Sequence, residues 1–378
     1  LLVSVGLLGK SFLRLRAVNP GFDPQGVLTA SVSLPQVRYQ SDASVIKFFN
    51  SALANLRALP GVRAAAIVNV VPLSGDFDRT GFVIRGKTFG TGEQESPDRY
   101  IVSPGYFQTL RVRLRQGRFF DSRDDERHPP VCIISETAAR LWFPGESPLG
   151  KKIRAGAASG DFDSWPFREV VGVVGDVAQY ALNLPATPQI YMPHAQYASR
   201  FLTFIVRMDA APAAFARSVQ KAVFAIDPEQ PVYNIKPLEQ IVSNTIAARR
   251  LGVWLLGVFA LCALTLASVG VYAVVAYSVA QRTAEFGIRK ALGARSGDIL
   301  SEGLLSSMPM IGAGLLGGIA ASLALSKLAA RFLYSVSTTD AFTFAVLPLL
   351  LGVIAVGACY LPAWRAARID LVIALRHE

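Results

Sequence analysis

The chain has 378 residues, of which 52% are hydrophobic and only 17% are charged, and its mean hydropathy is +0.37. This composition is too apolar for an ordinary soluble protein of this size and indicates a membrane protein. The net charge of +11 does not indicate a nucleic-acid-binding protein, because Lys and Arg are spread along the chain rather than gathered on one element among aromatic residues.

The first apolar segment is LLVSVGLLG, residues 1–9. A helix of this length reaches only about 13 Å, less than half of a hydrocarbon core about 30 Å thick. The segment also lacks the basic start of a signal peptide. We therefore expect residues 1–18 to be a transmembrane helix that is truncated at its N-terminal end, and the chain to be part of a longer protein.

Residues 19–246 alternate short β-rich runs with amphipathic helices and Pro, Gly and Asp clusters, which is typical of an α+β domain. Two β-α-β units have a similar design. One runs from GVLTASVSL through a helix at about 43–59, and the other from FLTFIVRM through a helix that begins near Pro212. We expect them to form a split ferredoxin-like layer, with residues 80–195 as an inserted, mostly β subdomain.

The insert contains three predicted strands, near residues 99–103, 131–135 and 169–177, and one short helix at ETAARLWF. The segment GFVIRGKT, 81–88, matches the phosphate-binding P-loop pattern letter by letter. A phosphate cradle needs a glycine-rich loop that opens a helix, whereas residues 82–85 are typical of a strand. We therefore do not expect this chain to hydrolyse ATP.

Residues 247–378 contain three charge-free windows, at about 251–280, 303–326 and 341–364. Each exceeds the roughly 18 residues that mark a membrane-spanning helix. With the truncated first helix, they predict a four-helix transmembrane domain. Because no proline lies between 237 and 289, two arrangements remain open before the first window: one continuous helix, or a break at 247–250.

Neither a metal site nor a cofactor site is predicted. The three cysteines and the three histidines are scattered along the chain: Cys132, Cys262, Cys359, His128, His194 and His377. No spacing among them suits a disulfide framework or a zinc site. We also find no nucleophile motif or pair of carboxylates, so an enzymatic role for the large domain has little support.

The segment QRTAEFGIRKALGARSGDIL, 281–300, brings charge back directly after the first window. On a helix, Glu285 and Arg289 would form an i, i+4 pair, and Gly287 would permit close approach of another backbone. The segment predicts either a docking element or a solvated loop between two spans. In the second window, Gly314 and Gly318 predict close helix packing, and the alternatives are a dimer contact or a kink hinge.

The segment RTAEFGIRKALGARSGDIL and the tail PAWRAARIDLVIALR closely resemble the cytoplasmic signatures of permeases of the MacB and FtsX superfamily. SPGYFQTLRVRLRQGRFF, VCIISETAARLWFPGESPLGKKI and VVGVVGDVAQYALNLPATPQIYMP resemble blocks of the MacB-type periplasmic core domain. The resemblance spans nearly the whole chain and is closest to duplicated orphan permeases, in which such a unit occurs twice. Phe286 and Leu371 depart from the usual aliphatic residue and proline.

The resemblance implies a multi-pass protein of the bacterial inner membrane whose large domain, residues 19–246, lies outside the cytoplasm. It also implies a permease subunit, not an enzyme, that couples ATP binding by a separate ABC ATPase to motion of this domain, for export or envelope transport. The other function left open is a signalling or scaffold protein that controls an envelope enzyme or sensor without transport.

The partners implied by the resemblance are the ATPase, a second permease unit in a homodimer or pseudo-dimer, and a periplasmic adaptor or enzyme. Orientation in the membrane rests on this resemblance, because Lys and Arg are equally frequent at the two ends of the predicted spans. The resemblance assigns docking on the ATPase to Glu285, Gly287, Arg289, Lys290, Leu292, Gly293 and Ala294.

Overall fold

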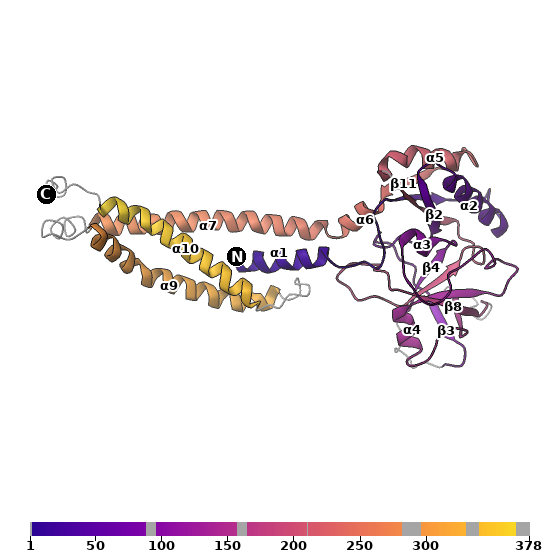
Figure 1. The fold of residues 1–378 in the computed structure, drawn as a ribbon, viewed down its shortest axis with the longest axis horizontal. Helices are drawn as coiled ribbons and strands as arrows, with labels where there is room; N and C mark the ends of the chain where they lie inside the picture. The colour runs from indigo at the N-terminus through magenta and orange to yellow at the C-terminus, as the bar shows by residue number, and fades with distance from the viewer. Residues whose placement is uncertain are drawn as a thin grey trace. The chain divides into compact units, whose positions relative to one another are not determined.

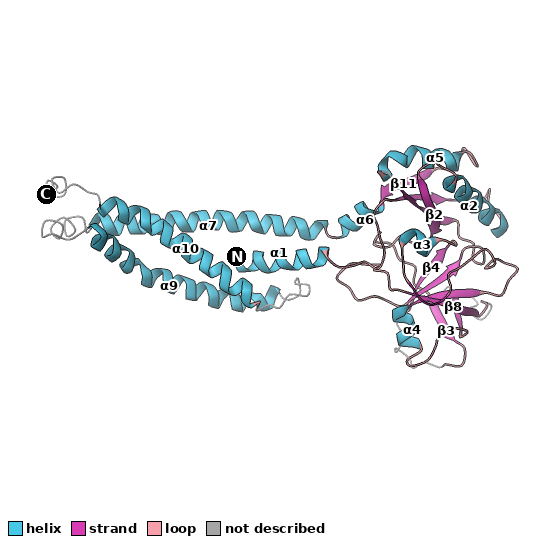
Figure 2. Cartoon of the chain, in the orientation of Figure 1, coloured by secondary structure: helices cyan, strands magenta, loops and turns pink. Residues whose placement is uncertain are grey.

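The computed structural model describes residues 2–87, 96–156, 165–209, 211–281, 296–329 and 340–367. The chain divides into two compact units. One, the helical unit, comprises Leu1–Ala17 and Ala248–Glu378, and the other, the sheet unit, comprises Val18–Ala247. Figure 1 follows the chain through both units, and Figure 2 shows that the strands belong to the sheet unit.

The described part of the sheet unit contains one 11-stranded sheet. Its strands are β1 (Val27–Ser33), β2 (Val62–Val68), β3 (Gly81–Ile84), β4 (Asp98–Val102), β5 (Leu114–Gly117), β6 (Val131–Ser135), β7 (Lys152–Gly156), β8 (Arg168–Val174), β9 (Gln189–Pro193), β10 (Phe201–Met208) and β11 (Val232–Pro237). They follow the order β11-β1-β10-β2-β4-β9-β6-β8-β7-β3, and β5 pairs with β8 outside this path.

One half of the sheet consists of β11, β1, β10 and β2, all of which pair in antiparallel fashion. The units β1-α2-β2 and β10-α5-β11 interleave in the strand order of the split β-α-β fold. Helices α2 (Asp42–Arg57) and α5 (Ala216–Phe224) bury their apolar faces in one core with these strands. Helix α2 begins where the Ser41 side chain accepts a hydrogen bond from the Ser44 N–H, 3.2 Å away.

The other half of the sheet is formed by β3 to β9, together with α3 (Tyr106–Leu110) and α4 (Glu136–Trp142). It continues the first half through the pairing of Val68 with Val102. It also differs from the first half in pairing, because β4 with β9 and β6 with β8 run parallel. The strands expected near 99–103, 131–135 and 169–177 are β4, β6 and β8, whereas β5, β7 and β9 are not predicted from the sequence.

The helical unit contains α1 (Leu2–Arg16), α7 (Ala247–Gln281), α9 (Ser296–Ala329) and α10 (Ala341–Ala367). Each charge-free window of the sequence lies within one of the last three helices. In the described part of the chain, one helix is long and apolar enough to cross a membrane, Arg250–Tyr277, while Ile311–Ala324 and Phe344–Tyr360 are shorter apolar stretches. Helix α1 packs on α10, where Val3 and Leu7 are buried against Phe344 and Leu347.

The chain is not one continuous helix between the sheet and the first charge-free window. Helix α6 (Leu238–Thr245) ends at Ile246, which has φ −105° and ψ −1°, and α7 begins at the next residue. The continuous helix left open by the sequence is therefore wrong. The break lies one residue before the range expected for it, at a position that neither proline nor glycine marks.

Candidate functional site

The predicted docking residues lie outside the described residues. Helix α7 ends at Gln281 and α9 begins at Ser296, and residues 282–295 are not described. This gap contains Glu285, Gly287, Arg289, Lys290, Leu292, Gly293 and Ala294. Their docking role remains a prediction.

Gly314 and Gly318 lie in α9, which also contains Pro309. A Cβ atom placed on either glycine would have no heavy atom within 4 Å. Among the described residues, no neighbouring helix therefore makes the close approach that the small-residue spacing predicts. Gly318 faces a cavity among the helices of this chain, so the position left open for a packing partner from outside the described residues is that of Gly314.

A cavity of about 240 Å³ lies among the helices of the helical unit. Residues of α1, α7, α9 and α10 line it, including Val3, Leu264, Gly318 and Leu351. None of its lining residues carries an ionisable side chain. The cavity therefore provides apolar contact and no acid, base or metal ligand.

The surface of α7 is rich in exposed apolar side chains. Trp254 is 71% exposed, Phe259 is 60% exposed and Leu266 is 75% exposed. A contiguous surface of this kind is unfavourable in water and marks a membrane or a protein partner. The helix is thus suited to an apolar environment.

Helix α6 is anchored to the sheet unit just before α7 begins. The Leu238 side chain is fully buried, and the Glu239 carboxylate accepts a hydrogen bond from the Gly26 N–H, 3.3 Å away. Only Ile246 separates α6 from α7 in the sequence.

A polar cleft of about 420 Å³ opens beside α6 in the sheet unit. Its lining residues include Thr29, Ser31 and Thr203 from the strands, and Asn244 and Thr245 from α6. The hydroxyls of Ser31 and Thr203 lie 2.9 Å apart, and Thr29 Oγ1 donates to the Lys236 carbonyl at 2.9 Å. The cleft therefore presents hydroxyl and amide groups, which suit a polar ligand or a polypeptide.

Tyr180, on the wall of the polar cleft, is fixed by a buried carboxylate. Asp98 is 2% exposed and accepts hydrogen bonds from the Tyr180 hydroxyl and from Thr187 Oγ1. Arg79 Nε also donates to the Tyr180 hydroxyl at 3.1 Å. Burial, followed by the hydrogen bond to Asp98, raises the pKa of Tyr180, so the phenol stays protonated and keeps its donor role. No sequence motif marks this cleft, because its lining comes from separate segments of the chain.

The P-loop-like segment is structural. Gly81–Ile84 forms β3, which pairs with β7, and Phe82 and Ile84 are buried in the core of this half of the sheet. The strand predicted for the middle of the motif is therefore confirmed. Its backbone N–H groups belong to a sheet and not to a phosphate-binding turn at the start of a helix.

Family models match two parts of the chain in order. Residues 14–222 match the MacB-like periplasmic core domain, and residues 257–371 match the FtsX-like permease C-terminal domain. The boundary between the matches lies in the region where the sheet unit ends and α7 begins.

Curated relatives carry both regions. A macrolide export ATP-binding/permease protein MacB of Rhodospirillum rubrum is 28% identical, over 100% of this chain and 53% of its own length. A probable syringafactin export ATP-binding/permease protein SyfD of Pseudomonas syringae pv. tomato is 29% identical, over 73% of this chain and 42% of its own length. The chain thus spans about half or less of the length of these relatives.

Among solved structures, the periplasmic region of MacB from Actinobacillus actinomycetemcomitans matches 59% of this chain and 94% of its own, with a TM-score of 0.40 and 17% identity. The assignment rests instead on the family models, of which the first alone covers more than half of the chain. The chain belongs to the MacB-like periplasmic core domain family, and with its FtsX-like C-terminal domain it is a permease of the MacB/FtsX type of ABC transporter.

Proposed function

We propose that the chain is the permease subunit of an ABC transporter that works by mechanotransmission. ATP binding by a separate cytoplasmic ATPase moves the transmembrane helices, and this motion drives the domain outside the cytoplasm, for export or envelope transport. The observation that carries the proposal is the order of the two family matches in one chain, a periplasmic core domain followed by a permease domain.

The proposed location is the bacterial inner membrane. The segments 251–280, 303–326 and 341–364 cross it, residues 1–18 are part of a further, truncated transmembrane helix, and residues 19–246 form the periplasmic core domain. The long apolar helix α7 supports this arrangement, because its exposed Trp254, Phe259 and Leu266 side chains suit lipid better than water.

The proposed ATPase is a partner protein. The relatives are named ATP-binding/permease proteins, and this chain spans about half or less of their length. Its own P-loop-like segment forms a strand. In this proposal, ATP is hydrolysed by a partner that docks on the segment between α7 and α9, through residues such as Glu285 and Arg289.

A second permease unit is the proposed partner for α9. The space beside Gly314 is open among the described residues, which leaves room for close approach of another helix, whereas Gly318 faces the cavity of the helical unit. A homodimer or a pseudo-dimer with a second permease unit satisfies this requirement. Movement of one permease unit against the other would then reach α7.

The proposed path of transmission runs from α7 through Ile246 to α6. Because Leu238 is buried in the sheet unit and Glu239 binds the Gly26 backbone, α6 cannot move without moving the sheet edge. The polar cleft is lined partly by α6, so the same motion changes the width of this cleft. We expect motion of α6 to open and close the polar cleft of the sheet unit.

Copurification tests this function. The full-length parent protein is tagged, native membranes are solubilised gently with a non-hydrolysable ATP analogue, and the bound proteins are identified by mass spectrometry. We expect an ATP-binding subunit. A periplasmic hydrolase or sensor kinase without any ATPase would contradict the transport proposal and favour a signalling or scaffold role.

A further inference from the structure

A second cavity in the sheet unit, called the Arg168 cavity here, has a volume of about 440 Å³. It is lined by the first turn of α2, the loop before β6, the segment that leads into β8 and the loop after β9. The side chains that matter for its chemistry are Asp42, Glu126, Trp165, Arg168, Gln196 and Tyr197. It shares no lining residue with the polar cleft.

Arg168 is a buried cation that makes no ion pair with any of the described residues. It is only 3% exposed, and no carboxylate of the described residues makes an ion pair with its guanidinium. Its Nη1 donates to Gln196 Oε1 at 3.2 Å and its Nη2 donates to the Gln196 carbonyl at 3.4 Å. The Nε group has no hydrogen-bond partner. Among the described residues, two long hydrogen bonds to neutral oxygens are therefore the compensation that this charge receives.

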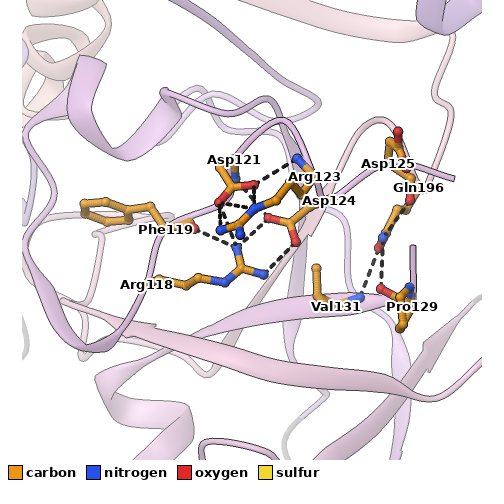
Figure 3. Close-up of polar contacts among 9 residues, drawn as sticks. All are labelled: Arg118, Phe119, Asp121, Arg123, Asp124, Asp125, Pro129, Val131 and Gln196. Atoms are coloured by element: carbon orange, nitrogen blue, oxygen red, sulfur yellow. Dashed lines mark hydrogen bonds and ion pairs between the residues drawn. The ribbon is translucent and has the colours of Figure 1, made fainter. Parts of the chain in front are cut away.

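The side chain of Gln196 already makes hydrogen bonds with the backbone around it, as Figure 3 shows. Its Nε2 donates to the carbonyls of Asp125 and Pro129, at 3.0 Å and 3.1 Å. Its Oε1 accepts from the Val131 N–H at 3.0 Å as well as from Arg168. This network fixes the position of Gln196, and it supplies no negative charge to Arg168.

Buried charges in proteins are normally paired, because the loss of hydration is costly without an opposite charge. Burial lowers the pKa of Arg168, because the loss of hydration disfavours the charged guanidinium. A buried guanidinium that lines a cavity and makes no ion pair with the described residues is suited to receive an anion from outside. We propose that the Arg168 cavity binds a small organic carboxylate, which forms the missing ion pair with Arg168.

The walls of the cavity select the kind of anion. The rings of Trp165 and Tyr197 are stacked, with centroids 5.3 Å apart and an angle of 23° between their planes. Trp165 packs directly on Gly156, where a Cβ would lie 2.8 Å from the indole ring. Arg99 donates to the Tyr197 hydroxyl at 3.0 Å and holds that ring in place. A flat apolar group attached to the carboxylate fits this aromatic wall.

The mouth of the cavity argues against a more highly charged ligand. Asp42 and Glu126 line it, and both residues are exposed. Their negative charges repel a dianion such as phosphate more strongly than a monocarboxylate. The proposal does not depend on the transport function, because every residue in it belongs to the sheet unit.

Titration calorimetry with sodium benzoate tests the proposal on the full chain in detergent micelles. Benzamide, which has the same shape without the charge, sodium acetate, which lacks the ring, and inorganic phosphate are titrated in parallel. The variants are Arg168→Gln, which removes the charge, Arg168→Lys, which keeps it, and Trp165→Leu, which removes part of the aromatic wall. Lys221→Gln, on an exposed position of α5, is the matched control for loss of one positive charge.

We expect benzoate to bind wild type, and to bind Arg168→Gln about tenfold more weakly or worse, since a charge-assisted hydrogen bond is lost. Benzamide should bind at least about tenfold more weakly than benzoate for the same reason. Trp165→Leu should weaken benzoate binding and leave acetate binding unchanged. Lys221→Gln should match wild type.

Thermal unfolding separates a binding role from a structural one. Benzoate should raise the unfolding midpoint of wild type and not that of Arg168→Gln, and Arg168→Lys should keep part of the shift. Equal benzoate affinity in wild type and Arg168→Gln, tighter binding of phosphate than of benzoate, or no binding by wild type would overturn the proposal. If Arg168→Gln fails to fold, unchanged benzoate affinity in both Arg168→Lys and Trp165→Leu would overturn it equally.

Discussion

Lys10 Nζ lies 2.6 Å from Asp340 Oδ1, so an ion pair joins α1 to the residue that precedes α10, 330 positions away in the sequence. The Lys10 side chain is 33% exposed and the Asp340 side chain is 17% exposed. The ion pair links the first described helix of the helical unit, α1, to the start of the last, α10. It does so beside the apolar contact of Val3 and Leu7 with α10.

This ion pair should contribute measurably to the stability of the helical unit. Because it is partly shielded from solvent, we expect Asp340→Asn to lower the free energy of unfolding by about 1–2 kcal/mol, between the values for exposed and buried pairs. A double-mutant cycle with Lys10→Met, followed by unfolding in detergent, measures the coupling. Strictly additive losses would show that the two side chains do not stabilise each other.

Two glycines with left-handed backbones should respond differently to alanine. Gly21 has φ +86° and a Cβ there would clash with the Asp176 carbonyl, whereas Gly75 has φ +92° and nothing within 4 Å. We expect Gly21→Ala to cost about 3 kcal/mol, since strain and clash add, and Gly75→Ala to cost about 1 kcal/mol from strain alone. Urea unfolding of both variants measures the difference, and equal losses would refute the close approach at Gly21.

Two serine caps provide a second matched pair. Ser135 is fully buried, and its Oγ accepts from both the Ala138 N–H and the Gln189 N–H at 3.2 Å. Exposed Ser41 caps α2 by accepting from the Ser44 N–H. We expect Ser135→Ala to cost about 3 kcal/mol, because two buried donors lose their acceptor, and Ser41→Ala about 1 kcal/mol. The prediction fails if calorimetric unfolding gives the two variants the same loss.

His194 should make the sheet unit sensitive to acid. It is 3% exposed, its Nε2 lies 2.8 Å from Asn50 Oδ1, and burial, with a smaller effect of Arg57, lowers its pKa from 6.5 to about 4. The unfolded chain therefore binds more protons than the folded chain between these values. Stability is lost as the pH falls from about 6.5 to about 4, by about 3 kcal/mol in total.

The variant His194→Gln tests this pH dependence. Its unfolding free energy should fall less than that of wild type over the same range. Denaturant unfolding at several pH values gives the comparison. A wild-type slope that persists in His194→Gln would assign the acid sensitivity to other groups.

Local patterns predicted the first half of the sheet. The apolar spacing of α2, with Val45, Phe49 and Leu53 on one face, and the Pro60-Gly61 stop are signals within one short segment. Two strands with such a helix between them suffice to predict each β-α-β unit. The interleaving of the two units then follows from known packing rules.

Other strands carry no comparable signal. Every residue of β5, LRQG, is exposed, so it has no apolar alternation, whereas β9, QIYMP, is buried throughout and ends in proline. Both form because distant strands offer them partners: β8 pairs with β5, and β4 and β6 pair with β9. Such long-range pairing cannot be inferred from a short window of sequence.

The candidate sites show the same limit. An arginine at the start of a predicted strand is ordinarily exposed, and only the fold reveals that Arg168 is buried beside Gln196. The sequence likewise gives no signal for the helix break at Ile246. In contrast, the assignment of the docking residues between α7 and α9 rests entirely on the sequence, and it remains a prediction.

The central claim is that Glu285 and Arg289 present charges to a partner ATPase, and charge exchange tests it most directly. Residues four apart on a helix are neighbours, so the double variant Glu285→Arg with Arg289→Glu restores their mutual pair but reverses the charges offered to a partner. The measurement is ATP turnover by the complex captured from native membranes, for wild type, both single variants and the double variant, with membrane insertion checked in each. We predict that all three variants lose the captured ATPase and its turnover. Recovery of capture and turnover in the double variant would contradict docking and assign the two residues a purely local role.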